Sequence, residues 1–536
     1  MNKYNWKYWT EVLLEFGSAD KFKWLCWASI TYLFFFVFAV IMRLYVSPVL
    51  ETYGHDREIF RYAGWALSQG VVPYVDFFDH KPPFIFIYNA IFADSGLWLH
   101  WVKFPVFMAV CATAYFVILK RFNPRLAWLT ASIYVFVGSD PGILQGGGLT
   151  RELSSGIVLV FLGLMMKIRL QQVGGWLDGF LVGILAGTVP FIQTEQVIIL
   201  FPLIGWLILD YNILFERVSS FRFSEKDSSM ENLFRKLISV GAGGLVPFLL
   251  FSCYLVLNGA IEEFIQVAIL FNTRIYIPNV HLFTRLQNSI TGVAGLPLLF
   301  GIFFIGIVFS SILKGINRSK FELAVLITLL MFLVSVSLSG RIFGHYFAAW
   351  APLFALCTYL FCTFEENMKL WKKGNRTPSE ICLGTLIFLA WFSARQPSEW
   401  WTQFSNGVIR TVSNTQIPTL PIDLKISQYL NQLKGKPGAL FIMQDVSSLH
   451  YYIDYKILAP TKFIYQGLWG LGPEFESQYG PFTQILKDLD KHQTAFIYDC
   501  SWNKPLPKEQ QITWDNYLFA NYSPAFIEEC KFLKRN

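Results

Sequence analysis

Long runs of hydrophobic residues separated by short polar segments dominate the first 400 or so residues of the chain. A helix needs about 20 apolar residues to cross the hydrocarbon core of a bilayer, so this pattern predicts eleven membrane-spanning helices. Several runs are shorter than a full span and are expected to extend into their flanks. The predicted spans are Trp24–Val46, Leu97–Leu119, Leu126–Gly138, Leu153–Ile168, Trp176–Pro190, Val197–Leu209, Leu237–Leu257, Ile290–Leu313, Leu323–Leu338, Phe347–Phe364 and Ile381–Ala394.

The pattern changes after the last of these runs. Short β-type stretches (ALFIM, KFIYQ and TAFIY) alternate with helical patterns (IDLKISQYLNQLK and FTQILKDLDKH). We therefore predict a transmembrane domain over residues 1–396 and a C-terminal α/β domain over residues 397–536, which is a normal domain size. The first outer loop, residues 47–96, is expected to hold two short interfacial helices, Glu58–Ser68 and Pro83–Phe92.

Composition supports a polytopic membrane protein. Hydrophobic residues make up 54% of the chain and charged residues only 15%, against about 25% in soluble proteins. The net charge of +7 does not indicate nucleic-acid binding, because the basic residues gather in short loops that the positive-inside rule assigns to the cytoplasm. This rule predicts a cytoplasmic N-terminus and an extracytoplasmic C-terminal domain. There, Cys500 and Cys530 could meet as a disulfide.

A few basic residues fall on the outer side, against the topological bias. Such residues are candidates for anion binding, and the alternative is that each is a lone surface charge. They are Arg57, Arg61, Lys81, Arg151, Arg274, Arg285 and Arg341.

The first outer loop contains the densest cluster of ionisable residues in the first half of the chain: His55, Asp56, Arg57, Glu58, Arg61, Asp76, Asp79, His80 and Lys81. Polar groups beside a membrane are costly to keep unless they are used. The transfer of a sugar from a lipid-phosphate donor needs a cation that stabilises the charge of the leaving phosphate. It also needs a carboxylate that accepts the proton of the attacking hydroxyl. Asp56 follows the first span and Lys81 precedes the second, so both could serve one site. The alternative is a loop that merely turns into an interfacial helix.

Pro82 and Pro83 follow Lys81 directly. Proline fixes its own φ and keeps the preceding residue out of the α region. Lys81 is therefore expected on an extended stem at a rigid corner, a geometry suited to aiming a cation.

The stretch D-R-E-I-F-R-Y-A-G-W-A-L-S-Q-G-V-V-P-Y-V-D-F-F-D-H-K-P-P-F resembles the first periplasmic loop of bacterial membrane glycosyltransferases of the GT-C class. These are relatives of the protein O-mannosyltransferases and the lipid A aminoarabinose transferases. Asp56 matches the catalytic carboxylate, and Lys81–Pro82–Pro83 matches the motif that closes the loop. Gly340–Tyr346 (GRIFGHY) also looks like a recurrent feature that opens a late helix. The chain departs from the family at Arg57, where many relatives have Glu, and at His80, where aminoarabinose transferases have Glu.

The resemblance implies a GT-C-like helical fold and a bacterial inner-membrane enzyme that transfers a sugar, with inversion, from a polyprenyl-phosphate donor. The acceptor is a glycan, lipid or protein. Asp56 is then the general base. The lipid phosphate and donor are assigned to Lys81, Arg341, His345, Tyr346, Arg274 and Arg151. For His345, a structural hydrogen bond at a helix start is the alternative.

Further residues are assigned supporting roles. Glu152 is expected to form an ion pair with Arg151, with an acceptor contact as the alternative. His55, Glu58, Asp79 and His80 are assigned to acceptor binding or support. A divalent metal ion on His55, Asp79 and His80 is left open as the possible cofactor, although their spacing lacks the tightness of a dedicated zinc site.

Three other functions are compatible with a helical bundle of this kind. A transporter or flippase tends to place ionisable groups near the bilayer midplane, often in repeated halves, and this chain shows neither feature. A lipid-linked glycan polymerase or ligase would use outer arginines and a histidine but no acid in the first loop. A structural membrane protein with a partner-binding outer domain leaves the charged loop unexplained.

Overall fold

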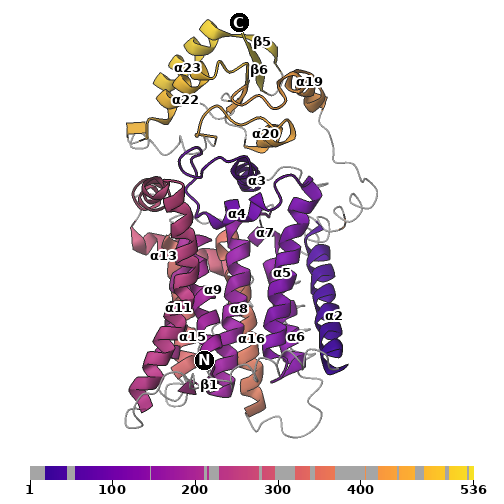
Figure 1. Ribbon diagram of the computed structural model, residues 1–536, viewed down its shortest axis with the longest axis vertical. Coiled ribbons are helices and arrows are strands. Elements are labelled where there is room, and N and C mark those ends of the chain that lie inside the picture. The colour runs from indigo at the N-terminus through magenta and orange to yellow at the C-terminus, as the bar shows by residue number, and fades with distance from the viewer. Residues whose placement is uncertain are drawn as a thin grey trace, which may run out of the picture.

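The computed structural model describes residues 19–44, 55–144, 147–210, 214–215, 228–276, 281–295, 320–338, 344–367, 405, 421–443, 446–464, 476–477, 479–500, 506–527 and 530–536. Most of the described chain is helical. Long helices run side by side to form a bundle, a layer of short elements covers one end of it, and a small mixed α/β domain lies beyond that layer (Figure 1).

The bundle is built from apolar helices whose bounds follow the hydrophobic runs. They are α2 (Ala19–Met42), α5 (Leu97–Leu119), α6 (Pro124–Gly138), α8 (Thr150–Gln171), α9 (Trp176–Thr188), α10 (Phe201–Leu209), α11 (Ser228–Leu257), α15 (Lys320–Leu338) and α16 (Trp350–Asn367). Among the described residues, four of them, α5, α8, α11 and α15, are long and apolar enough to cross a membrane. Shorter apolar helical stretches accompany them at Cys26–Met42, Trp176–Phe191 and Thr194–Leu209. This is the architecture of a multi-pass membrane protein.

The predicted spans up to Leu257 each coincide with a described helix, as do the two at Leu323–Leu338 and Phe347–Phe364. The span at Ile381–Ala394 and most of Ile290–Leu313 lie outside the described residues. The structure describes α13 (Leu282–Gly295) at the start of the latter segment. The total of eleven spans therefore stays a prediction.

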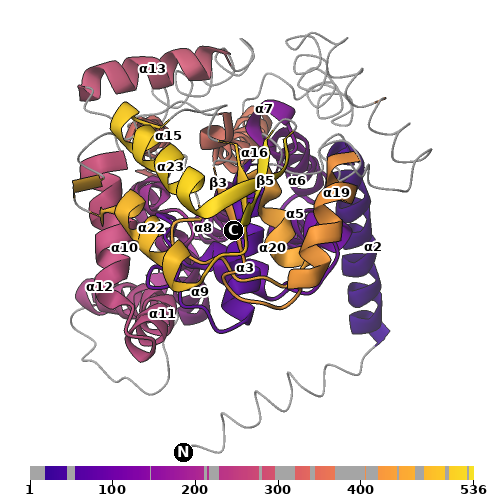
Figure 2. The same cartoon turned by 90° about the horizontal axis from the view of Figure 1, so that it is seen from above.

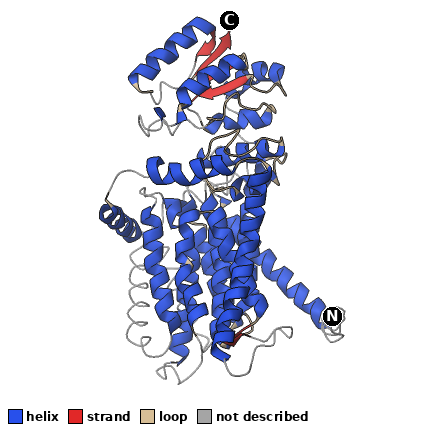
Figure 3. Cartoon of the chain, turned by 60° about the vertical axis from the view of Figure 1, so that its left-hand side comes forward, coloured by secondary structure: helices blue, strands red, loops and turns tan. Residues whose placement is uncertain are grey.

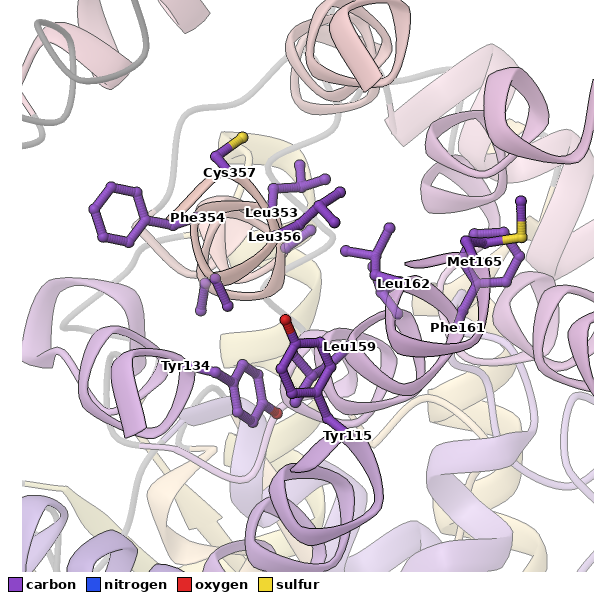
Figure 4. Packing of buried hydrophobic residues seen from close by; sticks show 14 of the residues in the cluster. Tyr115, Tyr134, Leu159, Phe161, Leu162, Met165, Leu353, Phe354, Leu356 and Cys357 are labelled. Carbon is purple, nitrogen blue, oxygen red and sulfur yellow. The ribbon is translucent and has the colours of Figure 1, made fainter. Parts of the chain in front are cut away.

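The helices of the bundle pack through aromatic and aliphatic side chains. Tyr115, Tyr134, Leu159 and Leu353 belong to one buried cluster where α5, α6, α8 and α16 converge (Figure 4). α9 and α11 lie close together, and their contact depends on glycine. A Cβ atom at Gly183 of α9 would collide with a main-chain carbonyl oxygen of α11. Small residues let membrane helices approach closely, and here they let α9 and α11 pack against each other.

One helix of the bundle is interrupted at its C-terminal end. α9 is followed by the 3-10 turns η3 (Val189–Phe191) and η4 (Thr194–Ile199) before α10 begins. Pro190 lacks an amide hydrogen and clashes with the preceding turn of a helix, which accounts for the break. The break leaves the polar residues Gln193 and Glu195 between two apolar segments.

The layer at the end of the bundle contains α3 (His55–Ser68), α4 (Phe84–Ala90) and α7 (Pro141–Leu144), together with α12 (Ile261–Phe264), the π-helical segments η5 (Ile265–Leu270) and η6 (Asn272–Tyr276), and the 3-10 turn η7 (Gly344–Phe347). The two interfacial helices predicted in the first outer loop are α3 and α4. Residues 57–66 of α3 are all buried, because the C-terminal domain covers the side of the helix that faces away from the bundle.

The C-terminal domain contains a four-stranded mixed sheet with the order β3-β4-β6-β5. β3 (Leu440–Met443) pairs in parallel with β4 (Phe496–Asp499), β6 (Lys531–Arg535) is antiparallel to β4, and β5 (Tyr522–Ile527) is antiparallel to β6. The helices are α19 (Pro421–Leu430), α20 (His450–Asp454), α22 (Pro481–Lys491) and α23 (Lys508–Asn521). The strands of this sheet are confined to one end of the molecule, and the short pair β1 (Val173–Gly174) and β2 (Leu214–Phe215) lies at the other (Figure 3).

Both helical patterns predicted for this domain form helices, ALFIM contains β3, and TAFIY overlaps with β4. The KFIYQ stretch was predicted as a strand, and this is wrong for its described part. Lys462, Phe463 and Ile464 form a loop that lies against the first outer loop, because the Phe463 ring packs on an aromatic residue there and not in the sheet. Cys500 and Cys530 form the disulfide that the sequence allowed.

Candidate active site

Lys81 lies at the end of a tight turn whose backbone is held from two sides. The Tyr74 hydroxyl donates a hydrogen bond to the Lys81 carbonyl oxygen at 2.8 Å, and the Lys81 amide donates to Oδ1 of Asp79 at 2.9 Å. Tyr74 has a φ of 72°, in the left-handed region, and its amide donates to the Phe77 carbonyl at 2.9 Å. Pro82 follows. The turn therefore presents the Lys81 side chain from a constrained backbone, as the two prolines predicted.

Asp56 lies in the first turn of α3, next to the helix N-terminus, where the helix dipole favours a negative charge. Its side chain is half-buried. The Asp56 carboxylate lies near enough to Lys81 and Asp79 to change the pKa of both. Asp56 and Lys81, from the two halves of the first outer loop, thus lie near each other at one end of the bundle.

The surroundings of Lys81 favour its protonated form. Burial lowers the pKa of the Lys81 ammonium, but Tyr276 and Tyr346, whose phenols are negative only at high pH, and the carboxyl groups of Asp56 and Asp79 outweigh that effect. The net pKa lies above its usual value. Lys81 is therefore a stable cation beside two phenols and two carboxyl groups.

Asp79 is a buried carboxyl group in the same turn as this cation. Burial raises its pKa to about 6, and the Asp56 charge adds to the rise, whereas the Lys81 amide and ammonium oppose it. Its neighbour His80 is also buried, and the His80 ring lies 4.3 Å from the ring centroid of Tyr276 on η6. The Asn272 side chain donates to the His80 carbonyl at 2.8 Å. These contacts tie the π-helical segment to the turn that carries Lys81.

A second group of side chains comes from the start of α8, the helix break and η7. The Arg151 guanidinium lies 3.5 Å from the ring centroid of Tyr346 and forms an ion pair with Glu195. Burial raises the pKa of the Tyr346 phenol to about 12, although Lys81 and Arg151 oppose that rise. Burial, with the charges of Arg151 and Lys81, lowers the pKa of His345 to about 2. Tyr346 is thus a neutral donor, and His345 a neutral imidazole.

The ion pair predicted between Arg151 and Glu152 is wrong. Glu152 instead pairs with Arg43 at the end of α2, and its Oε1 accepts a hydrogen bond from the Leu149 amide at 2.9 Å. Consecutive residues of a helix point in directions about 100° apart, so neighbours do not face each other. Arg151 turns toward Glu195, and Glu152 toward α2.

Glu58 is fully buried and holds two arginines of α3. It lies 3.4 Å from Arg57 and 3.2 Å from Arg61, and Arg61 also approaches Asp454 of the C-terminal domain at 3.8 Å. Arg57 packs against Gly148, where a side chain would collide with it. Glu58, Arg57 and Arg61 therefore bind one another and help to hold α3 in place.

Several assigned residues lie elsewhere or outside the described part of the chain. Arg274 is exposed on η6, within electrostatic reach of Tyr479 in the C-terminal domain. Arg341 and the side chain of His55 lie outside the described residues. Within the described residues there is no group of three or more His, Cys, Asp and Glu side chains placed to hold a metal ion.

Sequence reasoning did not single out Tyr74, Tyr276 or Glu195. Glu195 has a recognisable signal, because it lies in a polar run between two apolar segments at the predicted outer side. Tyr74 and Tyr276 have none, because aromatic residues are abundant in this chain and their partners are remote in sequence.

Comparison with solved structures relates this architecture to known proteins. ArnT from Cupriavidus metallidurans, bound to undecaprenyl phosphate, aligns with a TM-score of 0.53 and 12% sequence identity over 96% of this chain and 98% of that one. The apo oligosaccharyltransferase of Archaeoglobus fulgidus aligns with a TM-score of 0.49 and 13% identity over 89% of this chain and 70% of that one. No family model matches the chain, and no curated protein matches its sequence.

The fold is that of a polytopic membrane protein, and its similarity to ArnT agrees with the resemblance seen in the first outer loop. More particularly, the chain shares the ArnT architecture along almost its whole length, including the C-terminal domain.

Proposed function

We propose that this protein is a glycosyltransferase that moves a sugar from a polyprenyl-phosphate donor to an acceptor at the outer face of the membrane. The observation that carries the proposal is the meeting of Asp56 and Lys81, a carboxylate and a stable cation, at the end of the bundle below the C-terminal domain. The shared fold with ArnT, whose structure contains undecaprenyl phosphate, supports the same donor class here.

The reaction is a single displacement. Asp56 accepts the proton of the acceptor hydroxyl, and the hydroxyl oxygen attacks the anomeric carbon on the face opposite the phosphate. The bond between that carbon and the phosphate oxygen breaks, the polyprenyl phosphate leaves with the electron pair, and the sugar is inverted. General-base catalysis of this kind contributes about 10²–10⁴-fold.

The leaving phosphate gains negative charge, which Lys81 stabilises as a fixed cation. Tyr346 and Tyr276 add hydroxyl donors, and Tyr346 is well suited because burial keeps its phenol protonated. His345 donates as a neutral imidazole, and we assign the further positive charge to Arg341. Arg151 has a different role. Its charge is balanced by Glu195, so Arg151 supports the Tyr346 ring and does not bind the phosphate by itself.

The site is expected to face the outside of a bacterial inner membrane, with a transmembrane domain over residues 1–396 and an outer domain over residues 397–536. The disulfide between Cys500 and Cys530 supports this orientation, because disulfides persist in oxidising compartments. The acceptor would then reach Asp56 from the side of the C-terminal domain.

The decisive experiment replaces the proposed base. The purified protein in proteoliposomes is supplied with radiolabelled polyprenyl-phosphate sugars, and Asp56→Asn is compared with Asp76→Asn. Asp76 is an exposed carboxylate in the same loop, whose Oδ2 accepts from the Val72 amide at 2.8 Å, a bond that asparagine can keep. Asp56→Asn should lose about 10²–10⁴-fold in rate and still bind undecaprenyl phosphate, while Asp76→Asn keeps its activity. Sugar transfer by Asp56→Asn at the wild-type rate would reject the assignment and favour a polymerase or ligase.

A further inference from the structure

Phe78, just before Lys81, joins the first outer loop to the C-terminal domain. Its ring centroid lies 5.5 Å from that of Phe463 and 5.4 Å from that of Tyr479, both in the C-terminal domain. Its amide donates a hydrogen bond to the Lys462 carbonyl at 2.8 Å. The turn that carries Lys81 is therefore anchored to this domain through both backbone and side chain.

Tyr479 also anchors the π-helical segment that carries Tyr276. Its hydroxyl donates to the Gln266 carbonyl of η5 at 3.0 Å, and its ring packs edge-on against Phe271 at 5.9 Å. Phe271 in turn packs edge-on against Phe78 at 5.3 Å. One side chain of the C-terminal domain thus contacts two segments of the candidate site that are far apart in sequence.

The same domain holds α3, which begins at the residue before Asp56. The Tyr62 ring lies 5.2 Å from that of Tyr452, and the Ala459 amide donates to the Tyr62 hydroxyl oxygen at 3.0 Å. Viewed from above, α20 lies over the region of α3, and α22 lies over the helices beside it (Figure 2). The segments carrying Asp56, Lys81 and Tyr276 therefore all contact the C-terminal domain.

We propose that the C-terminal domain is a positioning element of the active site, and that Tyr479 is the positioning residue that sets Lys81 and Tyr276 relative to each other. The physical reason is that the site is assembled from loop segments, which keep a common geometry only if a rigid body holds them. The catalytic part of this inference rests on the proposed function. The mechanical coupling between Tyr479 and the two segments does not.

The coupling is measured by hydrogen–deuterium exchange on the full-length protein in lipid nanodiscs. Tyr479→Ala removes the ring and the hydrogen bond, and Tyr479→Phe removes only the bond to Gln266. Tyr517→Phe is the control, because it deletes a tyrosine hydroxyl of the same domain that donates to Asp490 at 2.8 Å, away from the outer loop. Tyr479→Ala should raise exchange about tenfold in peptides covering residues 73–83 and 265–276. Tyr479→Phe should raise it in 265–276 alone, and Tyr517→Phe in neither.

Steady-state kinetics then tests positioning. Tyr479→Ala should lower kcat for sugar transfer at least tenfold with a smaller change in the donor KM, since Lys81 is needed most when the phosphate leaves, and Tyr479→Phe should recover most of kcat. Unchanged exchange in 73–83, or an unchanged kcat, overturns the inference. If Tyr479→Ala also loses protection in β3 and β4, it is unfolded, and Tyr479→Phe decides: unchanged exchange in 265–276 overturns the coupling. If the wild-type protein transfers no sugar and the Tyr479 variants still show the altered exchange, the proposed function is refuted and the coupling stands.

Discussion

The phenol of Tyr74 donates a hydrogen bond to the main-chain carbonyl of Lys81 across 2.8 Å, and this bond closes the turn that presents the lysine. Tyr74 is fully buried, with a φ of 72° that an aromatic residue seldom adopts. The turn is therefore held in its unusual backbone form by a side chain that packs and bonds across it.

Replacing this phenol should loosen Lys81. Tyr74→Phe keeps the ring and removes one hydrogen bond, at a cost of about 1 kcal/mol of folding stability. Because the lost bond ends on Lys81 itself, we expect weaker binding of undecaprenyl phosphate, measured with the purified protein. Tyr88→Phe is the matched control, since the Tyr88 hydroxyl donates to the Lys103 carbonyl at the same 2.8 Å. Equal losses of lipid binding in both variants would contradict a specific role for Tyr74.

The stability of the protein should depend on the ionisation of Asp79. Its pKa is about 6 in the folded protein, against 3.8 for an unperturbed carboxyl. Between these values the folded state holds a proton that the unfolded chain has lost, so stability falls as the pH rises from about 4 to about 6, by up to about 3 kcal/mol. Asp79→Asn removes this term and keeps an oxygen for the Lys81 amide. Thermal unfolding in detergent should show the variant gaining on the wild type through this window, and a constant difference would count against the raised pKa.

The buried pair of Arg43 and Glu152 should be strongly coupled. Arg43→Met or Glu152→Gln leaves one charge buried without its partner and should cost about 3–5 kcal/mol, whereas the double variant should cost clearly less than the sum. Unfolding in detergent measures the cycle. Lys456 and Asp94 form the comparison, because their side chains are 45% and 74% exposed and such pairs contribute at most about 1 kcal/mol. Additive losses at the buried pair would show that the two charges do not depend on each other.

Reduction of the disulfide should destabilise the C-terminal domain selectively. Cys500 and Cys530 close a loop of 30 residues, for which the chain-entropy estimate is about 3–4 kcal/mol. Cys500→Ala/Cys530→Ala should make the domain more sensitive to limited proteolysis and leave the bundle protected. Cys26→Ala, at an exposed free cysteine, serves as the control. A double variant as resistant as the wild type would show that the sheet alone holds the domain together.

Much of the candidate site could be predicted from local patterns. Asp56 and Lys81 were identified because their chemistry and their places beside two spans are visible in the sequence. The pairing of Arg151 was wrong, because its partner lies 44 residues away beyond a helix break, whereas the neighbouring carboxylate points elsewhere. The strand predicted around Phe463 was wrong for a related reason: its apolar residues cover an aromatic ring of the outer loop instead of filling the sheet.

Membrane insertion, the approximate positions of the helices and the constrained stem of Lys81 follow from the order of residues alone, because hydrophobic length and proline geometry act over a few neighbouring positions. Other features could be found only in the folded chain. These are the ion pairs, the packing of η5 and η6 against the turn that carries Lys81, and the anchoring of the first outer loop on the C-terminal domain. Each of these joins residues from tens to hundreds of positions apart, and such contacts depend on how helices pack in three dimensions, which no local pattern records.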